Sequence, residues 1–134
     1  MISGRTRYSQ ALGAFDQALI LASLSDDVII NVAVHDEPLR GKDTAAFLFG
    51  VLTQELAPFE LISEVVEGDT SVILFETALR GQRAHGLNVV NYQPDGLARE
   101  LTVFFRPLAA MRLVADVIGE HMAQRFGPPP EGLH

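Results

Sequence analysis

The sequence contains no cysteine, so it can form neither a disulfide framework nor a thiolate metal site. Basic residues are also few: 10 Lys and Arg stand against 17 Asp and Glu, which gives a formal net charge of -7 at pH 7. The basic side chains are scattered along the chain and form no stripe. Because phosphate backbones repel an acidic surface of this kind, we expect no nucleic-acid partner.

Long apolar runs are absent as well. No stretch reaches the ~18 uninterrupted apolar residues that a membrane-spanning helix needs, so no membrane segment is expected. The first residues carry positive charge, but Ser9 and Gln10 stand where a signal peptide would have its apolar segment. This pattern predicts a cytoplasmic protein.

The motifs of several large enzyme classes are missing from the chain. It has no Gly-x-Ser-x-Gly nucleophile elbow, no phosphate-binding loop and no dinucleotide fingerprint. Asp26, Asp27 and Glu37 are acidic, but no His-x-x-x-His or paired carboxylate spacing accompanies them. We therefore expect neither a metal nor a cofactor.

What the chain does contain is typical of one globular domain. Of its 134 residues, 48% are hydrophobic and 20% are charged. A chain of this length buries roughly two thirds of the surface that its unfolded form would expose. We assign residues 1–127 to a single domain. Because Pro128, Pro129 and Pro130 cannot continue a helix, we expect an extended, mobile tail over residues 128–134.

The first half of the chain alternates between helical and extended patterns. Apolar spacing predicts two short helices between residues 8 and 24, joined near Gly13 and Ala14, with Asp16 capping the second. Residues 25–27 should close this helical part, and the β-branched run 28–34 predicts a strand. A turn at 37–41 is then followed by a helix that begins with Asp43 or Thr44 as N-cap and ends near Leu56.

The second half is rich in strands. Short turns separate runs that predict strands at 59–67, 71–79, 84–92 and 98–105, an antiparallel meander. Pro107 suits the first position of a last helix that covers the sheet, and its apolar stripe comprises Leu108, Met111, Ala115, Ile118 and Met122. The layout is α+β, a class in which a cavity commonly remains between the helices and the sheet.

Three strings of the sequence resemble the SnoaL-like branch of the nuclear-transport-factor-like superfamily, over roughly residues 8–125. They are Pro38-Leu39-Arg40-Gly41-Lys42, Gly86-Leu87-Asn88-Val89-Val90, and the segment from Asp95-Gly96 through Leu101-Thr102-Val103-Phe104-Phe105-Arg106-Pro107-Leu108. The resemblance implies a cone: a curved antiparallel sheet with N-terminal helices, a middle helix and a C-terminal helix packed around a pocket. The superfamily includes ketosteroid isomerases, limonene-type epoxide hydrolases, polyketide cyclases, relatives of scytalone dehydratase, and members that only bind or dimerise. It therefore leaves the activity open.

The resemblance also suggests catalytic residues. Asn88 falls where ketosteroid isomerases keep a protonated aspartic acid that donates a hydrogen bond to the oxyanion. An amide is a donor at every pH, so Asn88 could play a similar part. Tyr8 is the counterpart of the isomerase tyrosine. The isomerase base, a carboxylate near the end of the first strand, has no direct counterpart here, and His35, beside Asp36 and Glu37, is the candidate base.

Other residues are expected to line the pocket or the outer face of the sheet. Along the third strand of the meander Asn88, Val90 and Tyr92 share one face and His85 lies on the other. The resemblance implies that the Asn88 face lines the pocket, which leaves His85 near the outer face or a dimer contact. Glu76 is either a pocket carboxylate or an ion-pair partner of Arg80, Arg99 or Arg106. His35 could equally be an exposed loop residue, and Asn88 could be satisfied by protein neighbours. The expected ligand contacts are Tyr8, Phe47, Val90, Tyr92 and Phe105.

Two functions are compatible with this pattern. In the first, a small, apolar, oxygen-bearing ligand enters the pocket, and acid–base chemistry isomerises, cyclises or dehydrates it without a cofactor. Whether any reaction follows binding is left open. In the second, the chain is a non-catalytic homodimer whose pocket is closed or serves to recognise a partner. Apolar residues on both faces of 71–79 and 98–105 favour a dimer through the outer sheet face in either case.

Overall fold

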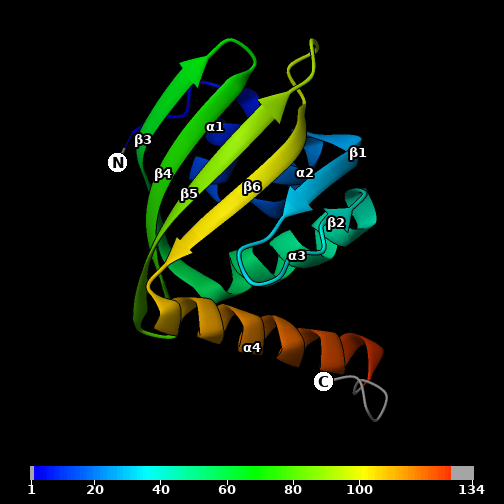
Figure 1. Ribbon diagram of the computed structural model, residues 1–134, viewed down its shortest axis with the longest axis vertical. Coiled ribbons are helices and arrows are strands. Elements are labelled where there is room, and N and C mark those ends of the chain that lie inside the picture. The colour runs from blue at the N-terminus through cyan, green and yellow to red at the C-terminus, as the bar shows by residue number, and fades with distance from the viewer. Residues whose placement is uncertain (1, 128–134) are drawn as a thin grey trace.

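A six-stranded curved sheet forms the body of the molecule in the computed structural model, which describes residues 2–127 (Figure 1). The strand order is β2-β1-β6-β5-β4-β3. Strands β3 to β6 form the predicted antiparallel meander, whereas β1 pairs parallel to β6 and antiparallel to β2. The bounds are β1 Leu24–Asn31, β2 Leu39–Arg40, β3 Leu56–Glu67, β4 Thr70–Leu79, β5 Gln82–Tyr92 and β6 Ala98–Arg106.

Four helices complete the fold, as predicted. Helices α1 (Arg7–Ala14), α2 (Gln17–Ala22) and α3 (Lys42–Glu55) lie on one side of the sheet, and α4 (Leu108–Phe126) runs across its open end (Figure 1). The predicted α+β cone is therefore confirmed, with a mixed sheet because of the parallel β1–β6 pair. The expected tail at 128–134 lies outside the described residues.

The two N-terminal helices are joined at Phe15, one residue after the predicted junction. Thr6 and Ser9 form a capping box at the start of α1, and Phe15 ends that helix in the left-handed region, at φ 50° and ψ 45°. Asp16 then caps α2 as predicted, because its carboxylate accepts a hydrogen bond from the Leu19 amide at 3.0 Å. Gly13 is helical instead of breaking the helix, and Leu61 packs against the face where its side chain would be.

The first strand begins and ends earlier than the sequence pattern predicted. Residues 25–27 belong to β1, which pairs with β6 at Leu24 and again from Ile29 to Asn31, and Asp26 and Asp27 are exposed. Residues 32–34 lie outside the sheet. The short β2, in a segment predicted to be a turn, pairs with Ile29 and Ile30 of β1. The prediction was wrong here because the exposed side of a strand accepts aspartate, whereas the apolar run 32–34 packs against the helices as a loop.

The predicted caps and buried face of the later helices also need correction. Gly41 is the N-cap of α3, so Asp43 and Thr44 lie inside its first turn, and Pro107 is the N-cap of α4 instead of its first residue. Helix α4 buries Ala110 and Val117, while Leu108 is 56% and Met122 is 48% exposed. The helix crosses the end of the cone and packs on Val51, Leu56 and Leu79, so a different face is turned inward.

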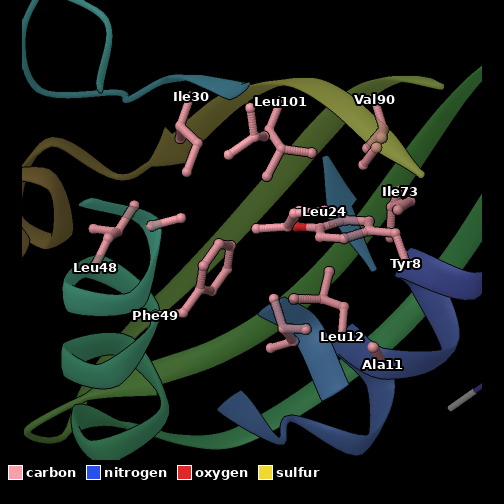
Figure 2. Packing of buried hydrophobic residues seen from close by; sticks show 14 of the residues in the cluster. Tyr8, Ala11, Leu12, Leu24, Ile30, Leu48, Phe49, Ile73, Val90 and Leu101 are labelled. Atoms are coloured by element: carbon pink, nitrogen blue, oxygen red, sulfur yellow. The ribbon is translucent and has the colours of Figure 1, made fainter. Parts of the chain in front are cut away.

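The main core fills the space between the sheet and the first three helices. Figure 2 shows Tyr8 and Leu12 entering it from α1, Leu48 and Phe49 from α3, and Leu101 from β6. Within the described residues, no helix has the length and apolar character required to cross a bilayer.

A buried polar network connects the start of α1 to the sheet, and no local sequence pattern predicts it. Glu64 of β3 is 8% exposed and accepts hydrogen bonds from the Arg5 amide at 2.6 Å and from Ser9 Oγ at 2.9 Å. Thr6 Oγ1 lies 3.4 Å from the second carboxylate oxygen and 2.9 Å from Tyr92 Oη. Through these bonds the network fixes the helix that carries Tyr8.

We predict that Glu64→Leu lowers the free energy of unfolding by about 1–3 kcal/mol, because it leaves buried donors unpaired. Denaturant unfolding monitored by circular dichroism measures the change. Glu67→Leu, on the exposed end of the same strand, is the matched control and should stay within about 0.5 kcal/mol of the parent protein. Equal stability of the two variants would show that the network contributes nothing to folding.

Candidate functional site

An interior cavity of about 80 Å³ lies between the sheet, α1, α3 and α4, and we call it the inner cavity. Asn88 and Tyr8 are its two polar lining residues among those the structure describes. Its other lining residues are apolar: Leu12, Phe15, Ile30, Val32, Ala33, Val34, Leu48, Phe49, Leu52, Leu56, Phe59, Phe75, Val103, Phe105, Val114 and Ile118.

A second, wider depression of about 560 Å³ lies between α4, α3 and the loop after β1, and we call it the outer groove. It is mostly apolar, with His35, Asp43, Thr44 and Arg125 as its polar lining residues. Both cavities are lined by the same four apolar side chains, which therefore form the partition between them: Val32, Val34, Leu48 and Ile118.

Asn88 lies on the inward face of β5, as predicted, and is 5% exposed. Among residues 2–127, no other residue forms a hydrogen bond with the Asn88 side-chain amide. A buried amide without a partner is costly by roughly 1–3 kcal/mol. The amide is thus available to a molecule in the inner cavity.

Tyr8 is fully buried and extends from α1 into the middle of the core, hydroxyl foremost (Figure 2). Burial is the main cause that raises the pKa of the Tyr8 phenol far above its usual range, and the nearby Tyr92 contributes in the same direction. The hydroxyl is therefore a neutral donor at every physiological pH. Together with the Asn88 amide, it is one of the two polar groups that line the inner cavity among the described residues.

His35 does not reach the inner cavity. It is an exposed residue of the loop between β1 and β2 and lines the outer groove, while Asp36 and Glu37 beside it are exposed as well. The structure therefore places the two predicted catalytic residues, His35 and Asn88, on opposite sides of the partition.

The other predicted contacts divide among three places. Phe105 lines the inner cavity, whereas Phe47 lines the outer groove. Val90 is fully buried in the core, and Tyr92 is bonded through its hydroxyl to Ser71 Oγ at 2.6 Å and to Thr6 Oγ1 at 2.9 Å. Neither lines the inner cavity.

Four phenylalanines in contact form one wall of the inner cavity, with two stacked pairs and one tilted pair. Ring centroids are 4.1 Å apart for Phe15 and Phe59, 4.9 Å for Phe59 and Phe75, and 6.1 Å for Phe75 and Phe105. Of these four rings, Phe105 was among the ligand contacts expected from the sequence. Phe15 was missed, because only its left-handed backbone at the end of α1 turns the ring toward β3.

A cluster of charged residues anchors α4 over the cavity. His121 Nε2 lies 2.8 Å from Glu55 Oε2, and Arg80 bonds both Glu55 at 3.3 Å and Glu120 at 2.8 Å. The hydrogen bond with His121, followed by that from Arg80, holds the pKa of the Glu55 carboxyl below its usual range. The cluster joins α3, the end of β4 and α4. Because these elements are far apart in sequence, no local motif could have predicted the cluster.

His85 lies on the outer face of the sheet, as predicted, and Glu76 lies beside it at 3.8 Å. The expected arginine partners of Glu76 are therefore replaced by His85, whose other ring nitrogen is 3.1 Å from Arg106 Nη1. Around this trio a row of apolar side chains crosses the outer face in register: Leu74 pairs with Leu87, and Leu87 with Phe104.

The curved sheet, the helices on one side of it and the cavity between them define a cystatin-like α+β fold. No family model and no curated protein sequence matches the chain. Among solved structures, a protein with a cystatin-like fold from Silicibacter pomeroyi superposes with a TM-score of 0.82 at 22% identity, covering 90% of this chain and 86% of that one.

Two further solved structures have the same fold. A steroid delta-isomerase from Pseudomonas aeruginosa has a TM-score of 0.78 at 14% identity, over 86% of this chain and 85% of its own. A SnoaL-like protein of unknown function from Burkholderia thailandensis has a TM-score of 0.61 at 22% identity, over 75% and 90%. The chain therefore has the nuclear-transport-factor-like, SnoaL-like fold that its sequence resembles, and identities this low show the fold alone.

Proposed function

We propose that the chain binds a small, apolar, carbonyl-bearing molecule in the inner cavity, with Asn88 and Tyr8 donating hydrogen bonds to the carbonyl oxygen. The observation that carries this proposal is the presence of two polar groups, the Asn88 amide and the Tyr8 hydroxyl, in an otherwise apolar cavity. A ligand carbonyl oxygen can accept hydrogen bonds from both donors, and hydrogen bonds from buried donors favour its binding over that of a hydrocarbon.

Binding, not turnover, is the function that the geometry supports best. Among the described residues that line the inner cavity there is no carboxylate and no histidine to abstract a proton. A general base must come within about 3.2 Å of the proton it removes, directly or through one water. Isomerase, cyclase or dehydratase chemistry would thus require the loop that carries His35 to move inward past the partition.

The size of the inner cavity restricts the ligand. Its volume of about 80 Å³ is far below the roughly 300–1,000 Å³ of pockets that enclose drug-sized molecules. A steroid-like ring system therefore does not fit without displacement of α4, whereas a narrow chain with a carbonyl group requires a smaller opening.

A thermal-shift comparison of matched compounds tests the proposal. Ketones and the hydrocarbons of the same shape should differ, because only the ketone accepts from Asn88 and Tyr8. A ligand present at about 100 times its dissociation constant adds about 2.7 kcal/mol of stability. Saturable stabilisation by ketones alone supports the proposal, and equal shifts with both compounds of a pair contradict it.

A second proposal, homodimerisation through the outer sheet face, is favoured by exposed apolar side chains on that face. Ile62 is 39%, Leu74 is 42% and Phe104 is 54% exposed, and they border a depression of about 430 Å³ together with Glu76, His85 and Arg106. Large contiguous apolar patches on a protein surface usually mark an interaction site. The polar trio beside the patch offers both signs of charge, which suits a self-complementary contact.

We predict that Phe104→Glu converts a dimer to monomer at micromolar concentration, because it places charge at the centre of the apolar row. Sedimentation velocity measures the state. Leu19→Glu, which alters an equally exposed side chain (53%) on α2, should leave the dimer intact. A parent protein that sediments as a monomer at the same concentration would refute the dimer.

A further inference from the structure

The outer groove contains a cation whose environment differs from that of the paired Arg80. Arg125, in the last turn of α4, has its guanidinium carbon 5.4 Å from the ring centre of Phe47 and 5.2 Å from that of Phe126. Two aromatic faces thus hold the side chain at the groove. Within residues 2–127 it makes no ion pair, in contrast to Arg80, which bonds two carboxylates.

A guanidinium held by stacking keeps its N–H edge available. That edge is planar and presents paired donors that match the two oxygens of a carboxylate. The other α4 residues that line the groove include three apolar side chains, Ala115, Ile118 and Met122. A ligand here would therefore have an apolar body and one anionic group.

The inner cavity and the outer groove adjoin at the partition, which consists of four aliphatic side chains and no backbone element of the sheet. Ile118, which belongs to α4, is one of them. Rotation of such side chains is a small rearrangement compared with displacement of a helix. A narrow chain is the shape that can pass through an opening of this kind and occupy both spaces.

We propose that the ligand is an elongated oxo carboxylic acid: its carbonyl-bearing chain occupies the inner cavity, and its carboxylate binds Arg125 at the outer groove. This inference rests on the proposed function, because it takes Asn88 and Tyr8 as the carbonyl donors. A single carboxylate is preferred over a dianionic phosphate, because Asp43 also lines the groove and the chain carries a formal net charge of -7.

The test measures dissociation constants by isothermal titration calorimetry for a medium-chain oxo fatty acid and its methyl ester. The ester keeps the chain and the ketone but lacks the charge. We expect the acid to bind the parent protein about 10-fold more tightly than the ester, as a bidentate charged pair contributes more than a neutral contact. Arg125→Gln should remove this ratio by weakening the acid alone.

Two further variants separate this inference from the function on which it rests. Arg112→Gln changes an exposed arginine of the same helix that lines neither space, so the acid-to-ester ratio should stay unchanged. Asn88→Leu should weaken acid and ester equally. If acid and ester bind alike, or if Arg125→Gln leaves their ratio intact, the carboxylate site is refuted while the carbonyl site stands. If neither compound binds, both proposals fail.

Discussion

Asn88→Leu should weaken binding of a carbonyl ligand by about 5- to 150-fold, the range that corresponds to the loss of a buried hydrogen bond of roughly 1–3 kcal/mol. The substitution removes the donor but keeps a side chain of similar volume. In the empty protein the amide has no described partner, so its removal costs the fold nothing. We therefore expect an unchanged or higher melting temperature together with the loss of affinity.

The opposite responses of stability and binding make this variant informative. Asn91→Leu is the matched control, because Asn91 lies on the same strand with its side chain on the outer face, where it accepts from Thr70 at 3.1 Å. Its affinity for the ligand should equal that of the parent protein. Calorimetry with a ketone identified in the thermal-shift comparison measures both. An Asn88→Leu protein that binds with parental affinity would falsify the assignment of Asn88 as a ligand donor.

Tyr8 is expected to act with Asn88, which explains why the buried network at Glu64 matters for the site. Tyr8 extends from α1, and α1 is held by the bonds from Arg5 and Ser9 to Glu64. A hydroxyl that must meet a ligand atom needs a fixed helix behind it. The network thus contributes to the site through position, although none of its members lines the inner cavity.

The meander was predictable because its signals are local. Turn residues such as Asp95 and Gly96 separate strands whose period of two assigns each side chain to a face. For that reason the sequence could place Asn88 and His85 on opposite faces of β5, whereas the choice of the Asn88 face as the inward one came from the family resemblance. The structure lengthens each of the four strands by no more than three residues beyond the predicted limits.

The remaining features depend on contacts between distant elements. Helix α4 carries apolar residues on more than one face, so its periodicity could not decide whether Met122 or Val117 would be buried. The choice is made by the place where α4 crosses the end of the cone. Likewise, His35 was placed near the pocket mouth by its position after an apolar strand, but the loop 32–38 carries it to the far side of the partition.

Gly86 is a position where a small change should be costly to the fold. It pairs with Phe75 on the neighbouring strand, and a Cβ built at Gly86 would overlap the Phe75 ring. Phe75 is 5% exposed and lies between Phe59 and Phe105, with centroid distances of 4.9 and 6.1 Å. The ring therefore cannot move aside without displacing the aromatic wall or entering the inner cavity.

We predict that Gly86→Val lowers the free energy of unfolding by about 2–3 kcal/mol, the upper part of the usual range of about 1–3 kcal/mol for an overpacked core, and lowers the melting temperature by roughly 10 °C. Gly119→Ala is the control: that glycine lies in α4 with open space around it, so the change should stabilise the protein by about 0.5–1 kcal/mol. Differential scanning calorimetry measures both.

A double-mutant cycle decides whether the Phe75 ring is the cause. Phe75→Ala alone should destabilise by about 3–5 kcal/mol, because it leaves a cavity in the aromatic wall. If Gly86→Val destabilises the protein by a clash with the Phe75 ring, the double variant should be markedly more stable than the sum of the two single changes predicts. The valine then fills the space that the ring occupied. Additive losses would mean that the strand backbone, and not the ring, requires glycine at this position, and the aromatic wall would then impose no constraint on β5.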